Sequence, residues 1–304
     1  MMKRPLSVGV QLPEVERVVT WPEIRDIAMT AQDVGFDSLW VGDHLLYRTD
    51  GETKGPWEAW SVLAALAAVT RTVSLGPLVG ATAFHNPAMF AKKAATVNEI
   101  SDGRLVLGIG AGWNKVEFDA YGFPFDRRAS RFEEAFTIIR TLLTDGAIDF
   151  EGEFYVLRDC ELVPPARPGI PLMVGSEGPR VLRATLPHVA RWNGWHAWYD
   201  NSLEGAEKLL AKIDAACVDA GRDPSTLHRS LAVFVGAPGG HPGMRQGSPD
   251  RKSSLPIAGG PDAIAAHLMS LAGLGVSEVQ LVVDPITSAS VEWLAGVLAI
   301  LDTA

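Results

Sequence analysis

Residues 85–122 read HNPAMFAKKAATVNEISDGRLVLGIGAGWNKVEFDAYG, and the fold prediction starts from this stretch. Apolar residues at helical spacing predict a helix over Pro87–Ile100. After a short turn, the apolar run Arg104–Ile109 predicts a strand that is buried on both faces. A helix followed at once by such a strand indicates a parallel sheet covered by helices.

The same alternation continues on both sides of this stretch. Strands are predicted at residues 6–12, 37–41, 73–79, 104–109, 170–174, 189–194, 230–235 and 278–283. Helices are predicted at residues 22–34, with Thr20 as a candidate N-cap, and at 57–70, 87–100, 131–143, 203–220, 261–274 and 291–301, with another that begins near 178. Eight β/α units favour a closed barrel, so we expect an α/β fold with one (β/α)8 TIM-barrel domain over residues 1–304.

Two segments break the rhythm and predict insertions after strands four and seven. Residues 148–157 alternate in polarity around Gly152, which indicates a small hairpin. Residues 236–260 are rich in Gly, Pro and Ser. A long loop after a barrel strand lies on the catalytic face, so this one is either a lid or a flexible insertion.

Composition narrows the classes of partner. The net charge of −9 argues against a nucleic acid or an anionic membrane as partner. Cys160 and Cys217 lie far apart, and the histidines form no recognised metal motif, so we expect no metal site. The start of the chain has no long apolar region of the kind found in signal peptides, and we expect a cytoplasmic protein that acts on a small molecule.

Asp43 and His44 follow the second predicted strand, at the end of the barrel where active sites lie. A histidine beside an acid can be held in one tautomer and have its pKa raised, which suits proton transfer. The alternative is that Asp43 caps a turn and His44 satisfies a backbone group. We favour His44 as the catalytic residue because of its place at the strand end.

Glycines follow two other strands. Gly175-Ser176-Glu177-Gly178 lies between a strand and a helix, where backbone N–H groups can bind a phosphate, although glycines are common in ordinary loops of this kind. Gly108, Gly110 and Gly112 do not make the dinucleotide-binding fingerprint. They instead permit close approach of a flat ring or of a neighbouring backbone.

Several stretches together resemble the luciferase-like flavin- and F420-dependent oxidoreductases. They are WVGDHLL at residues 40–46, the stretch at 85–122, PLMVGSEGPR at 171–180, and the segment after Gly259. The resemblance implies a TIM-like barrel that binds F420 or FMN, and the Gly-Asp-His sequence is more similar to the F420-dependent branch. It also implies a non-proline cis peptide at Pro77–Leu78 or Leu78–Val79.

The resemblance implies roles for particular residues. The residues expected to contact the cofactor are Asp43, His44, Leu78, Gly80, Asn114, Gly175, Ser176 and Gly178, and Gln11, Trp113 and Trp195 are expected in the substrate pocket. Trp113 stands near the place where some F420 dehydrogenases carry a proton-donating glutamate, so a sugar-phosphate substrate is in doubt. Trp40, Trp57, Trp60, Trp113 and Trp195 suggest a flat or apolar substrate, with Trp40 and Trp60 favoured as core residues.

Three functions stay open on the sequence. The first is an F420-dependent oxidoreductase that moves a hydride, the second is an FMN-dependent monooxygenase that uses oxygen, and the third is a cofactor-binding protein without catalysis. The intact Asp43-His44 pair counts against the third. The family commonly forms dimers, and the apolar helix at 57–70 is a candidate interface, unless it is apolar only because it packs on the barrel.

Overall fold

A computed structural model describes residues 4–49, 51–240 and 255–304. Within them, nine parallel strand segments form one sheet in the order β5-β2-β1-β13-β12-β11-β10-β7-β6. They are β1 (Ser7–Gln11), β2 (Ser38–Val41), β5 (Ser74–Pro77), β6 (Gly80–Ala81), β7 (Leu107–Gly110), β10 (Leu172–Val174), β11 (Arg191–Trp195), β12 (His228–Gly236) and β13 (Glu278–Asp284).

The sheet is a nearly closed barrel, as the sequence predicts. β5 and β6 are two pieces of the third strand, separated by Leu78 and Val79. This strand pairs with β2 on one side and with β7 on the other, and Leu75 also bridges to Leu105 just before β7. The nine segments therefore correspond to eight barrel strands, and the weakly patterned strand predicted at 189–194 is confirmed as β11.

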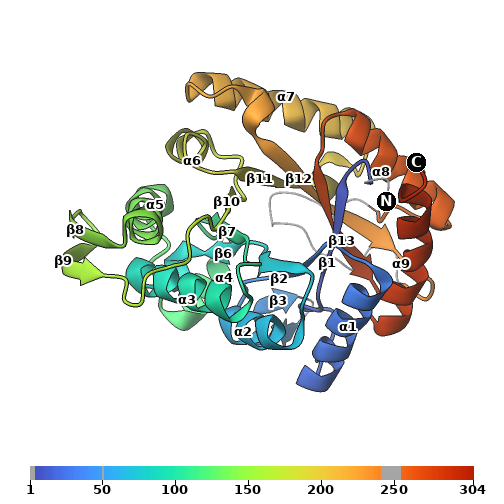
Figure 1. Ribbon diagram of the computed structural model, residues 1–304, viewed down its shortest axis with the longest axis horizontal. Coiled ribbons are helices and arrows are strands. Elements are labelled where there is room, and N and C mark those ends of the chain that lie inside the picture. Colours follow the sequence, from blue (N-terminus) through green and yellow to red (C-terminus); the bar gives the residue numbers. More distant parts are fainter. Residues whose placement is uncertain (1–3, 50, 241–254) are drawn as a thin grey trace.

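Helices surround the barrel (Figure 1). They are α1 (Trp21–Val34), α2 (Ala59–Val69), α3 (Pro87–Ile100), α4 (Lys115–Tyr121), α5 (Arg128–Asp145), α6 (Pro179–Thr185), α7 (Leu203–Asp219), α8 (Pro261–Gly273) and α9 (Ser288–Leu301). The sequence predicted all of these except the seven-residue α4. Thr20 precedes α1, but its side chain makes no capping hydrogen bond.

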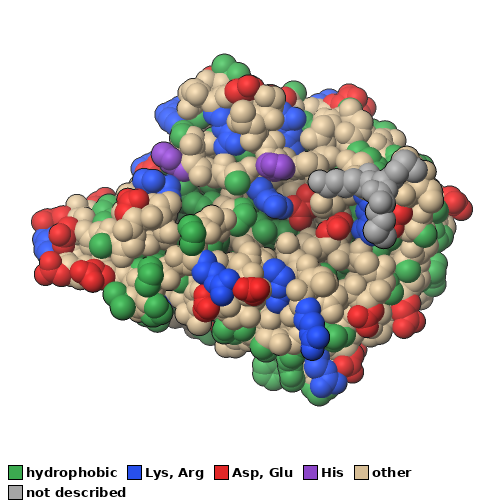
Figure 2. Space-filling model, viewed as in Figure 1, with side chains coloured by type: hydrophobic (Ala, Val, Ile, Leu, Met, Phe, Trp, Pro, Cys, Tyr) green, Lys and Arg blue, Asp and Glu red, His purple; other side chains and the backbone are tan. Residues whose placement is uncertain are grey.

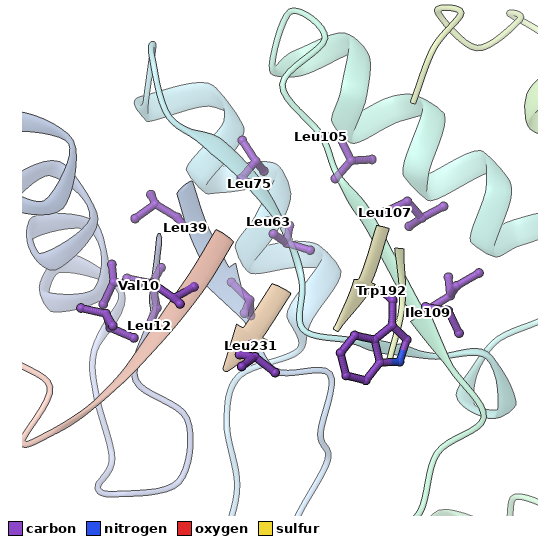
Figure 3. Packing of buried hydrophobic residues seen from close by; sticks show 14 of the residues in the cluster. Val10, Leu12, Leu39, Leu63, Leu75, Leu105, Leu107, Ile109, Trp192 and Leu231 are labelled. Atoms are coloured by element: carbon purple, nitrogen blue, oxygen red, sulfur yellow. The ribbon is translucent and has the colours of Figure 1, made fainter. Parts of the chain in front are cut away.

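The main core lies between the barrel wall and the helices. Leu39 of β2, Leu63 of α2 and Leu75 of β5 are fully buried there (Figure 3). Successive strand residues point to opposite faces, so Trp40 points into the barrel, where it packs with Met173. Trp40 and Trp60 are thus core residues, as favoured from the sequence, at 0% and 4% exposed.

Strands three and four approach each other closely because of glycines. A Cβ atom on Gly76 would collide with the carbonyl oxygen of Val106, and one on Gly108 would collide with that of Pro77. The sequence predicted that glycines of strand four permit close approach of a flat ring or of a neighbouring backbone. At Gly108 the second of these roles is confirmed. The expected cis peptide is found at Leu78–Val79.

The predicted insertion before the fifth barrel strand is a hairpin of β8 (Ala147–Glu151) and β9 (Val156–Glu161). Its turn is held by the Glu134 carboxylate, which accepts hydrogen bonds from three backbone N–H groups at residues 153–155. The hairpin projects from the body, and its outer end carries exposed acidic side chains (Figures 1 and 2). A second hairpin, β3 (Tyr47–Thr49) and β4 (Glu52–Lys54), was not predicted.

The loop predicted at 236–260 is described only at its two ends. Gly236 donates its N–H to the Ile257 carbonyl at 2.9 Å, so the returning chain runs beside the end of β12. The predicted lid falls largely on residues 241–254, outside the described residues.

The opposite end of the barrel, where the strands begin, holds a cavity of about 860 Å³. Arg4 and Asp302 both line it, and their side chains form an ion pair with Nε and Oδ1 2.5 Å apart. The first described residues and the last helix, α9, therefore lie side by side here (Figure 1). Among the described residues, no helix has the length and apolar character needed to span a membrane.

Candidate active site

A cavity of about 310 Å³ opens where the barrel strands end, and it contains most of the predicted site. A volume of this size is typical of small-molecule sites. The lining residues that the sequence predicted are Asp43, His44, Leu78, Trp113, Gly175, Ser176 and Trp195. Those that it did not predict include Glu117, Asn193 and Trp198.

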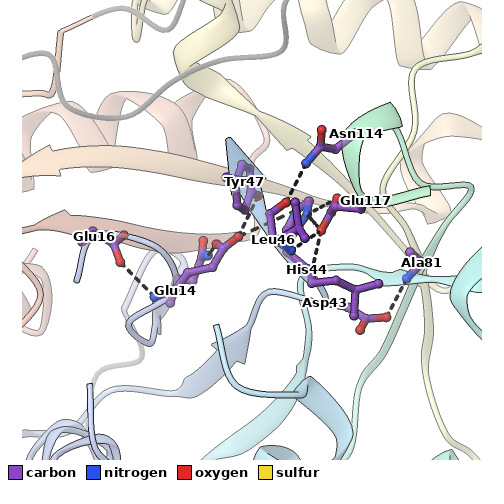
Figure 4. A network of polar contacts seen from close by, with 11 residues as sticks. Glu14, Glu16, Asp43, His44, Leu46, Tyr47, Ala81, Asn114 and Glu117 are labelled. Carbon is purple, nitrogen blue, oxygen red and sulfur yellow. Dashed lines mark hydrogen bonds and ion pairs between the residues drawn. The ribbon is translucent and has the colours of Figure 1, made fainter. Parts of the chain in front are cut away.

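His44 is held by Glu117, a residue of α4 that the sequence analysis did not single out (Figure 4). The His44 Nδ1 atom lies 3.0 and 3.1 Å from the two carboxylate oxygens. Glu117 is fully buried and also accepts the N–H of Leu45 at 2.5 Å. Because a carboxylate accepts but cannot donate when ionised, Nδ1 carries a proton and Nε2 is left facing the other way.

A second carboxylate, that of Glu14, lies on the Nε2 side of His44. Its Oε1 atom is 3.8 Å from Nε2 and accepts a hydrogen bond from the Tyr47 hydroxyl at 2.8 Å. Tyr47 packs on the His44 ring with centroids 4.8 Å apart, and Trp113 meets the same ring edge-on at 5.7 Å. The imidazole thus lies among two carboxylates and two aromatic rings.

These neighbours set the protonation of His44. Burial alone lowers its pKa, but the hydrogen bond to Glu117 and the charges of Glu14, Glu117 and Asp43 outweigh that effect, so the net shift of the pKa is upward. The side chain is 18% exposed, so it still reaches solvent or a ligand. The predicted rise in pKa is confirmed in direction.

Asp43 does not hold His44, which corrects the prediction that the adjacent acid would fix its tautomer. Asp43 Oδ2 instead accepts the Ala81 N–H at 2.9 Å and lies 3.0 Å from Nε2 of His85. Both Asp43 and His44 lie past the end of β2, where the chain turns. They therefore line one cavity while making separate contacts.

Two N–H groups of the loop at 175–178 are engaged within the protein. Gly175 donates its N–H to the Ile109 carbonyl at 3.0 Å, and Gly178 donates to the Ser176 side chain at 3.2 Å. The Glu177 carboxylate contacts the Tyr199 hydroxyl and the Lys212 ammonium. This loop thus contributes lining at Gly175, Ser176 and Glu177, while Gly178 lies outside the lining.

Four other predicted residues lie away from the cavity surface. A Cβ atom on Gly80 would collide with the Phe90 ring of α3, so this position faces the helix and not the cavity. Asn114 donates from its side chain to the Leu46 carbonyl at 3.1 Å. Gln11 is buried, and its side chain donates a hydrogen bond to Glu14 at 2.5 Å, so it helps to position the Glu14 carboxylate near His44. Trp57 is 59% exposed and is no part of the cavity lining.

His196, at the end of β11, also turns away from the cavity. It is fully buried, and its Nε2 atom lies 3.2 Å from Nε2 of His267 on α8. Burial, with the nearby His267, lowers the pKa of His196 to about 4. Within the part of the chain that the structure describes, no three His, Cys, Asp or Glu side chains are placed to hold a metal ion.

Leu78 and Val79 form an apolar part of the cavity lining. Cβ atoms added to Gly110 or Gly175 would approach Val79 methyl groups to 2.9 or 2.8 Å. These glycines therefore leave room for the Val79 side chain. Asp43, His44 and Asn193 add polar groups to the same lining.

The chain matches the family model described as luciferase-like monooxygenase over residues 6–237. It is 38% identical over 162 residues to 5,10-methylenetetrahydromethanopterin reductase of Archaeoglobus fulgidus, which is 53% of this chain and 45% of that protein. It is 34% identical over 167 residues to F420-dependent glucose-6-phosphate dehydrogenase of Amycolatopsis mediterranei, covering 53% and 49%. Pyrimidine monooxygenase RutA of Allorhizobium ampelinum is 32% identical over 172 residues, covering 55% and 46%. The matches thus span about half the length of these curated relatives.

Solved structures of similar fold cover almost the whole chain. An F420-dependent secondary alcohol dehydrogenase in complex with an F420–acetone adduct superposes with a TM-score of 0.81 at 18% identity, over 97% of this chain and 99% of that one. Coenzyme F420-dependent tetrahydromethanopterin reductase from Methanopyrus kandleri gives 0.76 at 21% identity, with the same coverage. At these identities the likeness establishes the barrel fold.

Proposed function

The chain belongs to the luciferase-like monooxygenase family, and on this premise we propose that it is an F420-dependent oxidoreductase that transfers a hydride between the deazaflavin and a small organic substrate. The observation that carries the proposal is His44, with its raised pKa, held by buried Glu117 in a cavity that Leu78 and Val79 also line. The relatives named for F420 support the choice of cofactor.

The apolar lining at Leu78 and Val79 suits a cofactor with a flat ring. Leu78, Val79 and Gly110 would lie against the flat ring, and Asp43 would meet its polar edge. Ser176 would meet the side chain that the ring carries. When bound, F420 supplies a ring carbon that accepts or gives up a hydride.

We assign the proton transfer to His44. Glu117 keeps a proton on Nδ1, so the proton that moves is the one on Nε2, on the side of Glu14 and Tyr47. A raised pKa keeps more of the imidazole charged at a given pH than in an ordinary histidine, which suits a proton donor or a stabiliser of negative charge. Trp113 and Trp195 line the cavity and exclude water from it.

The second candidate is an FMN-dependent monooxygenase that uses molecular oxygen. The family description and the similarity to RutA favour it. The two candidates differ in cofactor, because a deazaflavin does not readily activate oxygen. Identification of the cofactor therefore distinguishes them.

The deciding experiment is titration of the purified protein with F420 and, separately, with FMN, followed by fluorescence. We expect a micromolar or tighter dissociation constant for F420 and much weaker binding of FMN. A protein that copurifies with stoichiometric yellow flavin and does not bind F420 would instead support the monooxygenase.

Replacement of His44 tests its catalytic role. We expect His44→Ala to lower turnover at least about a hundredfold, because general acid–base help is typically worth that much or more. F420 affinity should stay within about tenfold, since Leu78, Val79 and the other lining residues are unchanged. His228, an exposed histidine at the other end of the barrel, provides the matched variant, and His228→Ala should leave turnover unchanged. Comparable turnover in both variants would remove His44 from the mechanism.

We further propose a flat or apolar substrate, because Phe84, Trp113, Trp195 and Trp198 line the cavity. We also propose that residues 1–304 act as one domain and that the chain works as a homodimer or a higher homo-oligomer.

A further inference from the structure

We propose that Lys93 and His85 form, with Asp43, a relay of hydrogen bonds that holds the Asp43 carboxylate oriented toward the ring of the bound cofactor. Asp43 is the cofactor contact, and His85 and Lys93 are positioning residues behind it. The inference rests on the proposed function in one respect, namely that a flavin-like ring occupies the cavity.

The three side chains form a continuous line from the cavity to the outside. Asp43 lines the cavity and is 3% exposed. Its Oδ2 atom lies 3.0 Å from His85 Nε2, and His85 Nδ1 lies 3.3 Å from Lys93 Nζ. His85 is itself nearly buried, and Lys93 on α3 is partly exposed.

The donors and acceptors fix the state of His85. An ammonium group only donates hydrogen bonds, so Nδ1 of His85 must accept from Lys93 and cannot carry a proton. The single ring proton is then on Nε2, which donates it to Asp43 Oδ2. The contact with Lys93 therefore selects the His85 tautomer that can donate to Asp43.

The surroundings reinforce this arrangement. The rings of Trp60 and Phe90 pack against His85 with centroids 6.4 and 5.1 Å away, so water reaches it poorly. Glu58, the N-cap of α2, is a further charged group near Lys93, whose positive charge helps to lower the pKa of the Glu58 carboxyl.

The relay also determines which oxygen of Asp43 serves the cavity. Among the described residues, the Ala81 N–H and His85 Nε2–H both bond to Oδ2. Oδ1 is thereby left to accept from a ligand N–H. The pyrimidine edge of a flavin or deazaflavin ring presents such a donor.

The first test needs no cofactor. Nitrogen-15 NMR of the histidine rings in the free protein, with His85 assigned from the signal lost in His85→Gln, should show that His85 carries its proton on Nε2 and not on Nδ1. Lys93→Met should allow a proton on Nδ1, whereas Lys93→Arg should keep Nδ1 as an acceptor. Lys92→Met, at the neighbouring lysine that contacts the Val163 carbonyl, is the matched control and should resemble the wild type. A wild-type His85 whose Nδ1 is protonated as it is in Lys93→Met would overturn the relay, whatever the cofactor.

The second test measures binding. His85→Leu removes one hydrogen bond to a charged group and should weaken F420 binding about tenfold or more, while His85→Gln keeps an N–H donor and should bind nearly as the wild type does. Lys93→Met should also weaken F420 binding, whereas Lys92→Met should bind F420 as the wild type does. Equal affinities in His85→Leu, His85→Gln and wild type would overturn the inference. If the wild type binds FMN and not F420, the proposed function fails, and the same comparison made with FMN decides the relay.

Discussion

At the scale of single residues, Glu117 controls the chemistry of His44. Its carboxylate is fully buried, accepts two backbone N–H groups and holds the Nδ1 proton of the imidazole. The position of Glu117 is itself fixed, because it lies in the first turn of α4, directly after the loop that carries Trp113. Loss of its charge would therefore change the acidity of His44 with little change of shape.

Glu117→Gln should shift the pH profile of turnover. The pKa of His44 is raised in the folded protein, so the imidazolium form is present below that pKa and is lost as the pH rises through it. An uncharged glutamine still accepts the Nδ1 proton but raises the pKa less. The alkaline limb of kcat should therefore move to lower pH, by about one unit.

The control for this variant lies on the same helix. Asp119 is exposed and paired with Lys115, so Asp119→Asn should leave the alkaline limb in place. If the alkaline limb of kcat also stays in place in Glu117→Gln, the titrating group responsible for that limb is not His44.

The residues that could be predicted at the site are those at strand ends. Asp43, His44, Trp113, Gly175 and Trp195 could be placed there because each follows a recognisable strand. Their partners could not, since His44 meets Glu117 across 73 positions of the chain and Asp43 meets His85 across 42. Sequence adjacency instead suggested a contact between Asp43 and His44 that the turn after β2 prevents.

At the scale of elements, strands three and four depend on Gly108. Gly108→Ala should lower the free energy of unfolding by about 2 kcal/mol, because its Cβ would force the two strands apart at the Pro77 carbonyl. Urea or guanidinium unfolding, followed by circular dichroism, measures this change.

Gly273→Ala provides the comparison within α8, where a Cβ atom would meet no neighbouring atom. Stability there should be unchanged or slightly higher. Equal stability of the two variants would show that the strands adjust without cost.

Elements with a long pattern could be predicted, and short ones could not. The 14-residue α3 gives several helical turns of apolar spacing, and its bounds match the prediction. The seven-residue α4 and the three-residue strands β3 and β4 are too short for a period to be recognised. Glu117 lies on α4 and Tyr47 lies on β3. The site residues that were not predicted from the sequence therefore include those on these short elements.

At the scale of the whole molecule, the barrel followed from the number and order of β/α units. Assembly is a further property at this scale. We expect a homodimer or larger at micromolar concentration in light scattering, as is common in the family. The helix α2 is the candidate surface, although Leu63 and Leu66 on it already pack inside the chain. A monomeric mass at that concentration would contradict this prediction.

The pairing of Arg4 with Asp302 has a practical consequence for attaching the protein to a support. Both residues lie at the end of the barrel where the strands begin, and the cavity with His44 opens at the other end. A linker joined near either residue would therefore leave the mouth of the site facing the solution. Because Arg4 and Asp302 lie side by side, a short peptide joined near both could also close the chain into a circle, and the chain could then be reopened at an exposed turn such as that of the β8–β9 hairpin.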